Sequence, residues 1–425
     1  MQLCKSDCPI TAFNLAFKGL QLAGQIIFAH VNEPLSSHGA SMLNFSFSNP
    51  TKIHFGEQQI ASIKHEIPAD AKVLVTYGGG SIKKNGIYEQ VAAALSEHSW
   101  FEFAGIEPNP SYQTCMKAVE LVQEKQIDYI LAVGGGSVID GSKFIAAAAQ
   151  YDGEPWDILA KGGEIKSAIA LGVVLTLPAT GSESNSFSVV SNLESHDKLP
   201  FASPFVQPQF AVLDPAVTYS LPKRQVANGI VDAFVHTMEQ YLTYDVGAKL
   251  QDRFAEGILM TLIEEGPKAF SEPDNYKVRA NIMWSATMAL NGLIGAGVPQ
   301  DWATHMLGHE MTAVYGLDHA QTLAVVLPRM MAEQKETKRG KILQYADRVL
   351  GLDISDEEHA INQAIAKTEA FFHSVNMPTR LSDYELGEDV ADKIVEQLER
   401  HGMTALGERE QVTLDKSRAI LLASV

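Results

Sequence analysis

Two stretches of the sequence share one pattern: residues 72–81 read KVLVTYGGGS and residues 128–137 read DYILAVGGGS. In each stretch, an apolar run of strand-forming side chains ends in three glycines and a serine. A helical pattern follows each one, over residues 86–95 and 138–149. Strands that alternate with helices are typical of a parallel sheet covered on both faces. The two stretches therefore predict an α/β sheet with glycine turns at the carboxyl ends of its strands.

The rest of the chain divides into two unlike parts. Before Leu221 the alternation continues, and the further expected strands are residues 100–103, 171–177 and 210–213. After Pro222 nearly every periodic segment reads as a helix, and the expected helices are residues 227–241, 253–263, 278–293, 357–372 and 390–401. A capping box at Ser355 and Glu358 is expected to open one of these helices. We expect a Rossmann-like α/β domain over residues 42–220 and a helical domain over residues 221–425.

The first 41 residues lack this alternation. Their apolar segment, residues 10–31, is interrupted by a lysine and two glutamines, which argues against a transmembrane helix. No small-residue cleavage site follows it, so it does not read as a cleaved signal peptide. Met42 opens the regularly patterned part of the chain. We expect residues 1–41 to be an extension outside the folded core.

The composition is that of an ordinary globular protein. Hydrophobic residues make up 46% and charged residues 20% of the 425 residues. The 33 basic and 51 acidic residues give a net charge of −18, which argues against nucleic acid or an anionic membrane as a partner. Cys4, Cys8 and Cys115 form no disulfide framework, so a cytoplasmic location is expected.

The glycine turns suggest a nucleotide. Glycine lets the backbone approach a pyrophosphate closely, and the free amides at the next helix N-terminus bind the anion. Neither turn matches the G-x-G-x-x-G fingerprint, and such turns are often purely structural. A third turn, at residues 180–182, is expected at the same sheet edge. We therefore favour nucleotide binding. Asp140 lies in the helix after the second turn. It could face the nucleotide, or its negative charge could simply stabilise the N-terminus of that helix.

A metal site is indicated in the helical part. Asp232 and His236 lie four residues apart in an apolar expected helix, so they share one face. The alternative is a pair facing solvent on an amphipathic helix. His305, His309 and His319 follow downstream, and one carboxylate with two or three imidazoles suits Zn²⁺ or Fe²⁺. Spacing alone nominates His305 and His309 as ligands, because they share a helix face.

At this point the sequence resembles a known family, the iron-containing (group III) alcohol dehydrogenases, in particular the branch of NADPH-dependent butanol dehydrogenases and broad-specificity aldehyde reductases. The resemblance runs from Asn44 to the C-terminus. The motifs that carry it are residues 77–84, 105–110, 132–140, 176–185, 228–236, 297–310 and 316–321. It implies a Rossmann-like domain, an all-α C-terminal domain as in dehydroquinate synthase-like folds, and an active site in the cleft between them.

The resemblance also implies roles for individual residues. The implied metal ligands are Asp232, His236, His305 and His319. His309, in place of the role that spacing gave it, is implied to lie near the nicotinamide as a proton relay. The implied cofactor contacts are Gly79, Gly80, Ser81, Asn109, Gly135, Gly136, Ser137, Asp140, Thr176, Thr180, Asn185 and Lys198.

The implied activity is reversible hydride transfer between NADP(H) and short- to medium-chain aldehydes and alcohols, with one Fe²⁺ or Zn²⁺ in a homodimer. We expect NADP(H) rather than NAD(H), because no acid follows the first strand until Glu89 while Lys83 and Lys84 do. Four alternatives remain open: an NAD-linked glycerol or other polyol dehydrogenase, a dehydroquinate-synthase-type lyase with a strongly basic pocket, a metallohydrolase whose glycine turns are structural, and a non-catalytic binding protein.

Overall fold

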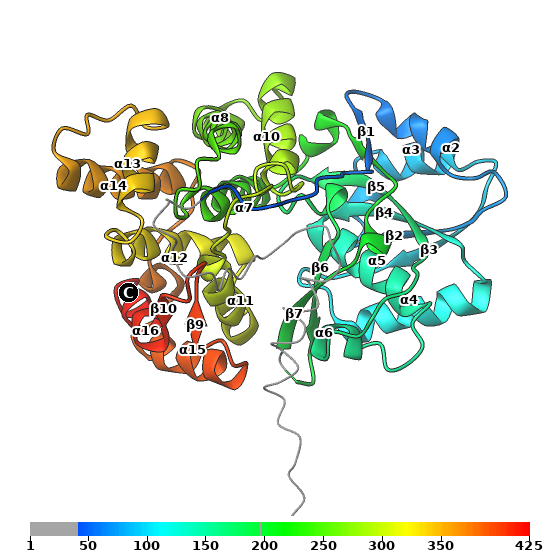
Figure 1. Cartoon of the computed structure of the whole chain (residues 1–425). Coiled ribbons are helices and arrows are strands. Elements are labelled where there is room, and N and C mark those ends of the chain that lie inside the picture. Colours follow the sequence, from blue (N-terminus) through cyan, green and yellow to red (C-terminus); the bar gives the residue numbers. More distant parts are fainter. Residues whose placement is uncertain (1–40, 196) are drawn as a thin grey trace, which may run out of the picture.

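The computed structural model describes residues 41–195 and 197–425 (Figure 1). The expected extension, apart from Ser41, lies outside these residues. None of the described helices combines the length and the apolar character that crossing a bilayer requires.

The first half of the described chain is built on one parallel sheet. Its strand order is β1-β8-β5-β4-β2-β3. The strands are β1 (Lys52–Phe55), β2 (Lys72–Tyr77), β3 (Ser99–Ala104), β4 (Tyr129–Gly135), β5 (Ala170–Leu177) and β8 (Phe210–Leu213). The α/β prediction is confirmed, and two of the expected strands, residues 72–77 and 210–213, have the expected bounds.

Helices cover both faces of this sheet, because the strands alternate apolar side chains between them. In β2, Val73 and Val75 pack with α2 (Ile63–Glu66) and α3 (Ile87–Ala94), while Leu74 packs on the opposite face. That face carries α4 (Tyr112–Lys125) and α5 (Gly136–Ala148), and Figure 1 shows the two layers. Buried strands of this kind explain the near-continuous apolar runs in the sequence.

An antiparallel hairpin that the sequence did not predict lies beside the sheet. It consists of β6 (Phe187–Asn192) and β7 (Asp197–Ala202), which pair with each other. Its register places Ser191 opposite Lys198. The hairpin matters for function because it brings Lys198 over the cavity described below.

The second half is helical. Its main helices are α7 (Lys223–Tyr241), α8 (Lys249–Glu265), α10 (Tyr276–Ala289), α11 (Ala303–Tyr315), α12 (His319–Glu333), α13 (Arg339–Arg348), α14 (Glu357–Ser374), α15 (Asp389–Arg400) and α16 (Leu414–Leu422). A short ladder of β9 (Ala405–Leu406) and β10 (Val412–Thr413) is the small exception to the expected all-α character. The expected capping box is wrong by one residue: Asp356, not Ser355, caps α14 by accepting the N–H of His359.

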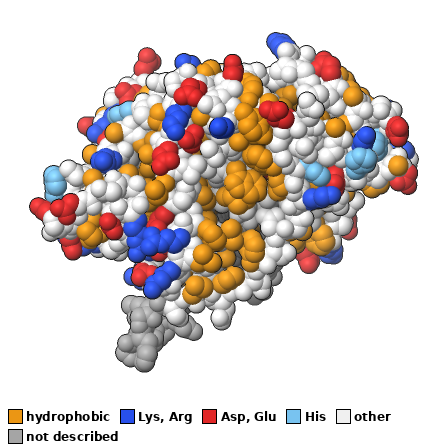
Figure 2. Space-filling model, turned by 90° about the horizontal axis from the view of Figure 1, so that it is seen from above, with side chains coloured by type: hydrophobic (Ala, Val, Ile, Leu, Met, Phe, Trp, Pro, Cys, Tyr) orange, Lys and Arg blue, Asp and Glu red, His pale blue; other side chains and the backbone are white. Residues whose placement is uncertain are grey.

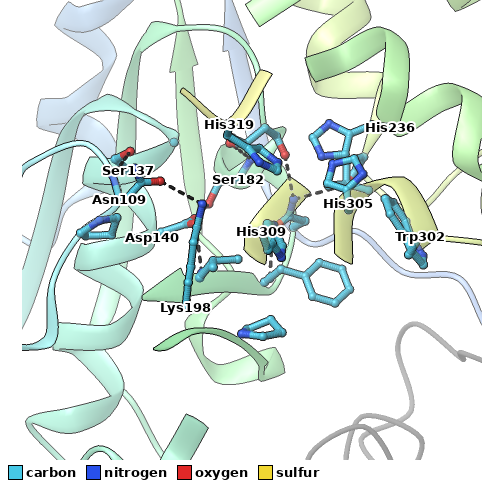
Figure 3. Close-up of a pocket in the computed structure, with 18 of the residues that line it drawn as sticks. Asn109, Ser137, Asp140, Ser182, Lys198, His236, Trp302, His305, His309 and His319 are labelled. Carbon is cyan, nitrogen blue, oxygen red and sulfur yellow. Dashed lines mark hydrogen bonds between the residues drawn. The ribbon is translucent and has the colours of Figure 1, made fainter. Parts of the chain in front are cut away.

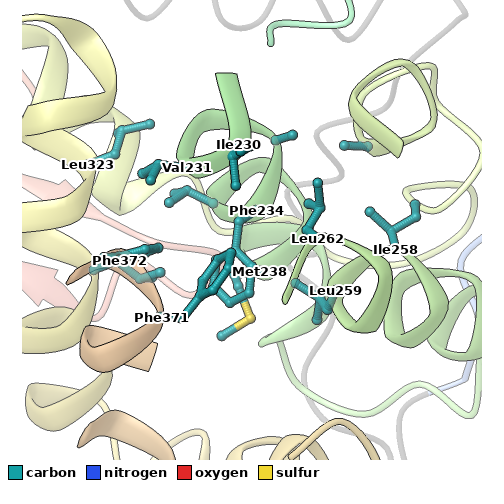
Figure 4. Close-up of a cluster of buried hydrophobic side chains, with 14 of the residues drawn as sticks. Ile230, Val231, Phe234, Met238, Ile258, Leu259, Leu262, Leu323, Phe371 and Phe372 are labelled. Atoms are coloured by element: carbon teal, nitrogen blue, oxygen red, sulfur yellow. The ribbon is translucent and has the colours of Figure 1, made fainter. Parts of the chain in front are cut away.

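Helix α7 is the centre of this half. The ring of Phe234 lies 5.0 Å from that of Phe371 and 5.5 Å from that of Phe372, between ring centroids, with Met238 in the same cluster (Figure 4). Side chains are buried along nearly the whole of α7. The alternative of a solvent-facing acid–histidine pair is therefore wrong, and the helix that carries Asp232 is fixed from several sides.

Candidate active site

Two adjoining cavities lie between the carboxyl edge of the sheet and the helical half. The larger, about 510 Å³, is bordered by the glycine turns after β2 and β4 and by the N-termini of α5 and α12. The smaller, about 210 Å³, lies between the β6–β7 hairpin and helix α11. The larger volume lies in the range typical of small-molecule sites. The residues common to both linings are Asn109, Gly136, Ser137, Thr180 and His319.

Three helices bring the acid and the histidines together. Asp232 and His236 lie on α7, while His305 and His309 lie on α11. His319 is the first residue of α12, and Figure 3 shows the labelled imidazoles gathered around one space.

The start of α12 is fixed to α7 by its capping residue. Asp318 accepts hydrogen bonds from Nε and Nη2 of Arg224, at 2.6 and 2.5 Å, and from Nδ2 of Asn228 at 2.7 Å. Its own N–H donates to Oε1 of Gln321. These bonds fix the position of His319, the next residue, relative to α7.

One oxygen is the focus of this cluster. Oδ1 of Asp232 lies 3.8 Å from Nε2 of His236, 4.0 Å from Nε2 of His305 and 3.7 Å from Nε2 of His319. Ligands about 2.0–2.2 Å from one tetrahedral ion lie roughly 3.3–3.6 Å apart, so these separations are close to what an ion needs. The donor atoms of Asp232, His305 and His319 lie within 4.8 Å of one another. His236 and His309 are not part of that group of three.

Two of the donor atoms in this cluster are buried without compensation from the protein. Asp232 Oδ1 and His305 Nε2 have no hydrogen-bond partner among the described residues. Burial raises the pKa of Asp232 and lowers the pKa of His236 to about 4 and that of His305 to about 3. Neutral imidazoles with free nitrogens beside a buried carboxyl oxygen are the donor set that a divalent cation requires.

Glu239 is a contributor that the sequence analysis missed. It lies on α7, and its Oε2 contacts Nδ1 of His305. Burial raises the pKa of Glu239, and the N–H donors of Thr304 and His305 oppose that shift. The available signal was its place three residues after His236 and seven after Asp232, on the same helix face.

His309 lies beside the cluster. Its ring centroid is 4.9 Å from that of His319 and 6.0 Å from that of His305 (Figure 3). Burial and the positive charge of nearby Lys198 hold the pKa of His309 well below its usual range. His309 thus lies beside the group of Asp232, His305 and His319, whereas spacing alone suggested that it binds the ion together with His305.

At several positions of these turns, only glycine fits the backbone conformation or the available space. A Cβ atom on Gly136 would lie 2.5 Å from the side chain of Thr180, and one on Gly134 would lie 2.5 Å from that of Val138. Gly80 has φ +86°, which L side chains rarely adopt. Gly135 precedes α5 and offers no side-chain cap, so the N–H groups that open this helix are available to an anion.

The expected cofactor contacts separate into two groups. Those that line the larger cavity are Gly79, Gly80, Ser81, Asn109, Gly135, Gly136, Ser137, Thr176 and Thr180. Asp140, Asn185 and Lys198 line the smaller cavity with the histidines. Asp140 accepts hydrogen bonds from the Ser182 hydroxyl and the Val189 N–H, which favours a structural part for its carboxylate.

Two buried lysines lie at or beside the smaller cavity. Nζ of Lys198 donates to Oδ1 of Asn109 at 2.9 Å, and burial lowers the pKa of Lys198 to about 8. Lys143, which the sequence analysis did not single out, is fully buried and donates to Ser182, Asn185 and Phe187. Burial lowers the pKa of Lys143 to about 7. Lys143 thereby holds the turn after β5 against α5.

Comparison with known families assigns the class. Residues 50–215 match the family described as iron-containing alcohol dehydrogenase, and residues 226–424 match the C-terminal part of the Fe-containing alcohol dehydrogenase family. The chain belongs to the iron-containing alcohol dehydrogenase family. The family resemblance, the fold class and the prediction of a metal-dependent alcohol dehydrogenase are confirmed.

Individual relatives agree with this membership. This iron-containing alcohol dehydrogenase is 60% identical over 386 residues to the NADPH-dependent aldehyde reductase YqhD of Escherichia coli, which covers 90% of this chain and 100% of that protein. It is 40% identical over 390 residues to the probable NADH-dependent butanol dehydrogenase 1 of Bacillus subtilis, again covering 90% and 100%.

Solved structures show the same fold. The crystal structure of E. coli YqhD gives a TM-score of 0.90 at 60% identity, covering 91% of this chain and 100% of that one. NADH-dependent butanol dehydrogenase A from Thermotoga maritima gives a TM-score of 0.87 at 35% identity, covering 91% and 100%.

Proposed function

We propose that this iron-containing alcohol dehydrogenase reduces short- to medium-chain aldehydes with NADPH and oxidises the corresponding alcohols in reverse. The observation that carries the proposal is the meeting of two cavities at His319, one lined by glycine turns and the other by imidazoles and apolar side chains. The E. coli relative at 60% identity is named an NADPH-dependent aldehyde reductase, which supports the same activity here.

Asp232, His236, His305 and His319 are the residues that would hold one divalent ion, Fe²⁺ or Zn²⁺. When bound, the ion supplies a Lewis acid for the substrate oxygen and the nicotinamide supplies the hydride. The protein contributes rigid placement, because Asp232 and His236 project from a helix buried on several sides. It also excludes water, since Asp232, His236 and His305 are at most 5% exposed.

The nucleotide would lie in the larger cavity along the ends of β2, β4 and β5. The N–H groups of Gly136 and Ser137, which open α5, would bind the pyrophosphate. The full proposed set of cofactor contacts is Gly79, Gly80, Ser81, Asn109, Gly135, Gly136, Ser137, Asp140, Thr176, Thr180, Asn185 and Lys198. Asp140, Asn185 and Lys198, which line the smaller cavity, would meet the nicotinamide end.

His309 is the proposed proton relay. Its lowered pKa keeps the imidazole neutral near pH 7, so one nitrogen carries a proton to donate and the other can accept one. A neutral His309 would pass a proton toward the substrate oxygen without adding a second cation beside the residues that would hold the ion.

The preference for NADPH is supported by the surroundings of β2. Glu102 of β3 is a nearby acid, but it accepts hydrogen bonds from Tyr77, Lys83 and Tyr88. It is therefore bonded to its own neighbours and is not part of the cavity wall. Lys83 is engaged by the same contact, so Ser81, which lines the cavity, is the better candidate to bind a 2′-phosphate.

The size and lining of the smaller cavity support aldehydes of modest length. Its volume of about 210 Å³ is small, and its apolar lining is Pro110, Phe187, Val189, Pro200, Leu290, Trp302 and Met306. Apolar walls discriminate one methylene by only about 1–3 kcal/mol. We therefore expect activity with several aldehydes rather than one.

The alternatives are less well supported. A lyase of the dehydroquinate-synthase type needs a strongly basic pocket, but the only basic residues in the described linings are Lys198 and Arg224. Arg224 is already paired with Asp318. A metallohydrolase would not account for the glycine-lined cavity that adjoins the histidines. An NAD-linked polyol dehydrogenase differs only in coenzyme and substrate, and kinetics decide it.

We also propose a homodimer in the cytoplasm, with the division between the domains near residue 220. Hydrophobic side chains form a band across the face that carries α8, α10 and β1 (Figure 2). The exposed large hydrophobic side chains on these elements include Phe55, Leu250, Phe254, Met260 and Trp284. Because β1 is also an edge strand, this face suits a second copy of the chain. Sedimentation tests the dimer.

The experiment that tests the function is a panel of aldehydes and alcohols with NADPH and NADH, on enzyme whose metal content has been measured. We expect turnover of several short aldehydes, with the higher kcat/KM for NADPH. Failure of micromolar NADPH to bind, measured by quenching of its fluorescence, would contradict the proposal.

A further inference from the structure

Glu239 uses both of its carboxylate oxygens inside the protein. Oε1 accepts hydrogen bonds from the backbone N–H of Thr304 at 2.6 Å and of His305 at 3.4 Å. Oε2 contacts Nδ1 of the His305 imidazole. The residue is 4% exposed, so water does not replace these partners. One side chain of α7 therefore binds both the start of α11 and the ring that α11 presents.

The contact with Oε2 bears on which nitrogen of His305 carries the proton. A carboxylate oxygen without a proton only accepts hydrogen bonds, so with Glu239 in that form Nδ1 of the ring is the donor. A neutral imidazole protonated at Nδ1 keeps its lone pair on Nε2. That Nε2 lies 4.0 Å from Oδ1 of Asp232 and has no hydrogen-bond partner among the described residues. The free lone pair is thus on the nitrogen within the cluster.

We propose that Glu239 is a positioning residue of the metal centre: it fixes His305 in the tautomer and orientation that leave Nε2 free to bind the ion. This inference rests on the ligand set of the proposed function. Removing a carboxylate that bonds the far nitrogen of a metal-binding imidazole typically lowers metal affinity by about 10- to 100-fold.

The substitution Glu239→Gln disrupts this arrangement with little change in shape. An amide offers one acceptor oxygen and one donor NH₂ group. If the oxygen faces Thr304, the NH₂ group faces Nδ1 of His305 and forces the ring proton onto Nε2. If the amide is reversed, the NH₂ group meets the two backbone N–H donors instead.

Asp301 provides a matched control. It is buried, and its Oδ1 accepts the N–H of Ala303 at 2.8 Å, at the start of the same helix α11. Its other oxygen pairs with Lys338 at 2.5 Å, and no imidazole is among its hydrogen-bond partners in the described chain. Asp301→Asn therefore weakens the start of α11 while leaving the contact between Glu239 and the His305 ring in place.

The test is the zinc affinity of the full-length, metal-stripped protein, measured by competition with a chelator. Thermal unfolding of the metal-free proteins checks that each variant folds. We expect Glu239→Gln to weaken zinc binding by about 10- to 100-fold and Asp301→Asn by less than about threefold. Unchanged affinity in Glu239→Gln, or equal weakening in both variants, would overturn the inference. Wild-type protein that binds no zinc would refute the proposed ligand set and the inference with it.

A second measurement does not depend on the variant folding. In zinc-free wild-type protein with ¹⁵N-labelled histidine, the nitrogen spectrum of His305 should show a protonated Nδ1. A proton on Nε2 instead would overturn the inference.

Discussion

His401 of the helical half lies 3.0 Å from Asp197 of the β6–β7 hairpin, measured from Nε2 to Oδ1. Its Nδ1 lies 2.7 Å from Oε1 of Glu310. Asp197 immediately precedes Lys198, and Glu310 immediately follows His309. The residue after α15 therefore bridges the two elements that face each other across the smaller cavity.

The first prediction concerns the pH dependence of this bridge. Burial alone would lower the pKa of His401, but the bonds to Asp197 and Glu310 outweigh it and raise the pKa to about 9. A group whose pKa is raised by folding stabilises the folded state fully below its unfolded pKa, about 6.5, and loses that effect as the pH rises through 9. Wild type should therefore exceed His401→Gln in stability by about 1–2 kcal/mol near pH 6.5, after allowance for solvent screening.

Urea unfolding of both proteins between pH 6.5 and 10 measures this effect. The difference between them must be used, because the lowered pKa values of Lys143 and Lys198 act in the same range with the opposite sign. The difference should shrink as the pH passes 9. A difference that stays constant with pH would show that the charge of His401 contributes nothing.

The second prediction concerns the coenzyme. A carboxylate introduced by Gly80→Asp would repel a 2′-phosphate, so the ratio of kcat/KM for NADPH to that for NADH should fall by about tenfold or more, equivalent to roughly 1.4 kcal/mol. Space for the side chain is open, but the positive φ of Gly80 strains any substitution. Gly80→Asn is the control, because it carries the same strain without the charge. An equal change in the ratio for both variants would contradict the electrostatic explanation.

The third prediction concerns the N-terminal extension. The N–H of Leu43 donates to the carbonyl of Gly297 at 2.9 Å, and Nδ2 of Asn49 bonds the carbonyls of Ser184 and Asn291. A chain that begins at Met42 keeps all of these bonds, so its Tm and turnover should equal those of the full chain. A chain that begins at Asn49 loses the contact with Gly297 and should melt at a lower temperature. Insoluble or inactive protein from the Met42 start would show that residues 1–41 belong to the fold.

Hydrophobic patterns along single segments predicted those strands and helices whose formation depends mainly on their own side chains. Residues 72–77 form a strand with the expected bounds because their apolar side chains serve both faces of a buried sheet. The β6–β7 hairpin was missed because its strands mix polar residues with apolar ones and are stabilised by pairing with each other. Helix α7 begins four residues before the expected start, immediately after Pro222.

The candidate site shows the same limit. Spacing along a helix relates His305 to His309, but it gives no information on which other helix approaches that face. His319 lies at the start of α12. The hydrogen bonds that Asp318 accepts from Arg224 and Asn228 of α7 hold this helix start in place. The sequence pattern named His319 as one of three candidate histidines, and only the resemblance to a known family chose it over His309. Glu239 was missed because its role depends on a contact with α11 that the sequence does not reveal.

Metal analysis of two purified variants, with their kinetics, tests the proposed ligand set most directly. His319→Ala removes one of four proposed ligands, so the protein should lose most of its metal and its activity. His309→Ala should keep nearly one ion per chain while its kcat falls or its pH dependence shifts. If His309→Ala loses the metal and His319→Ala retains it, the ligand set is wrong and His309 is a ligand.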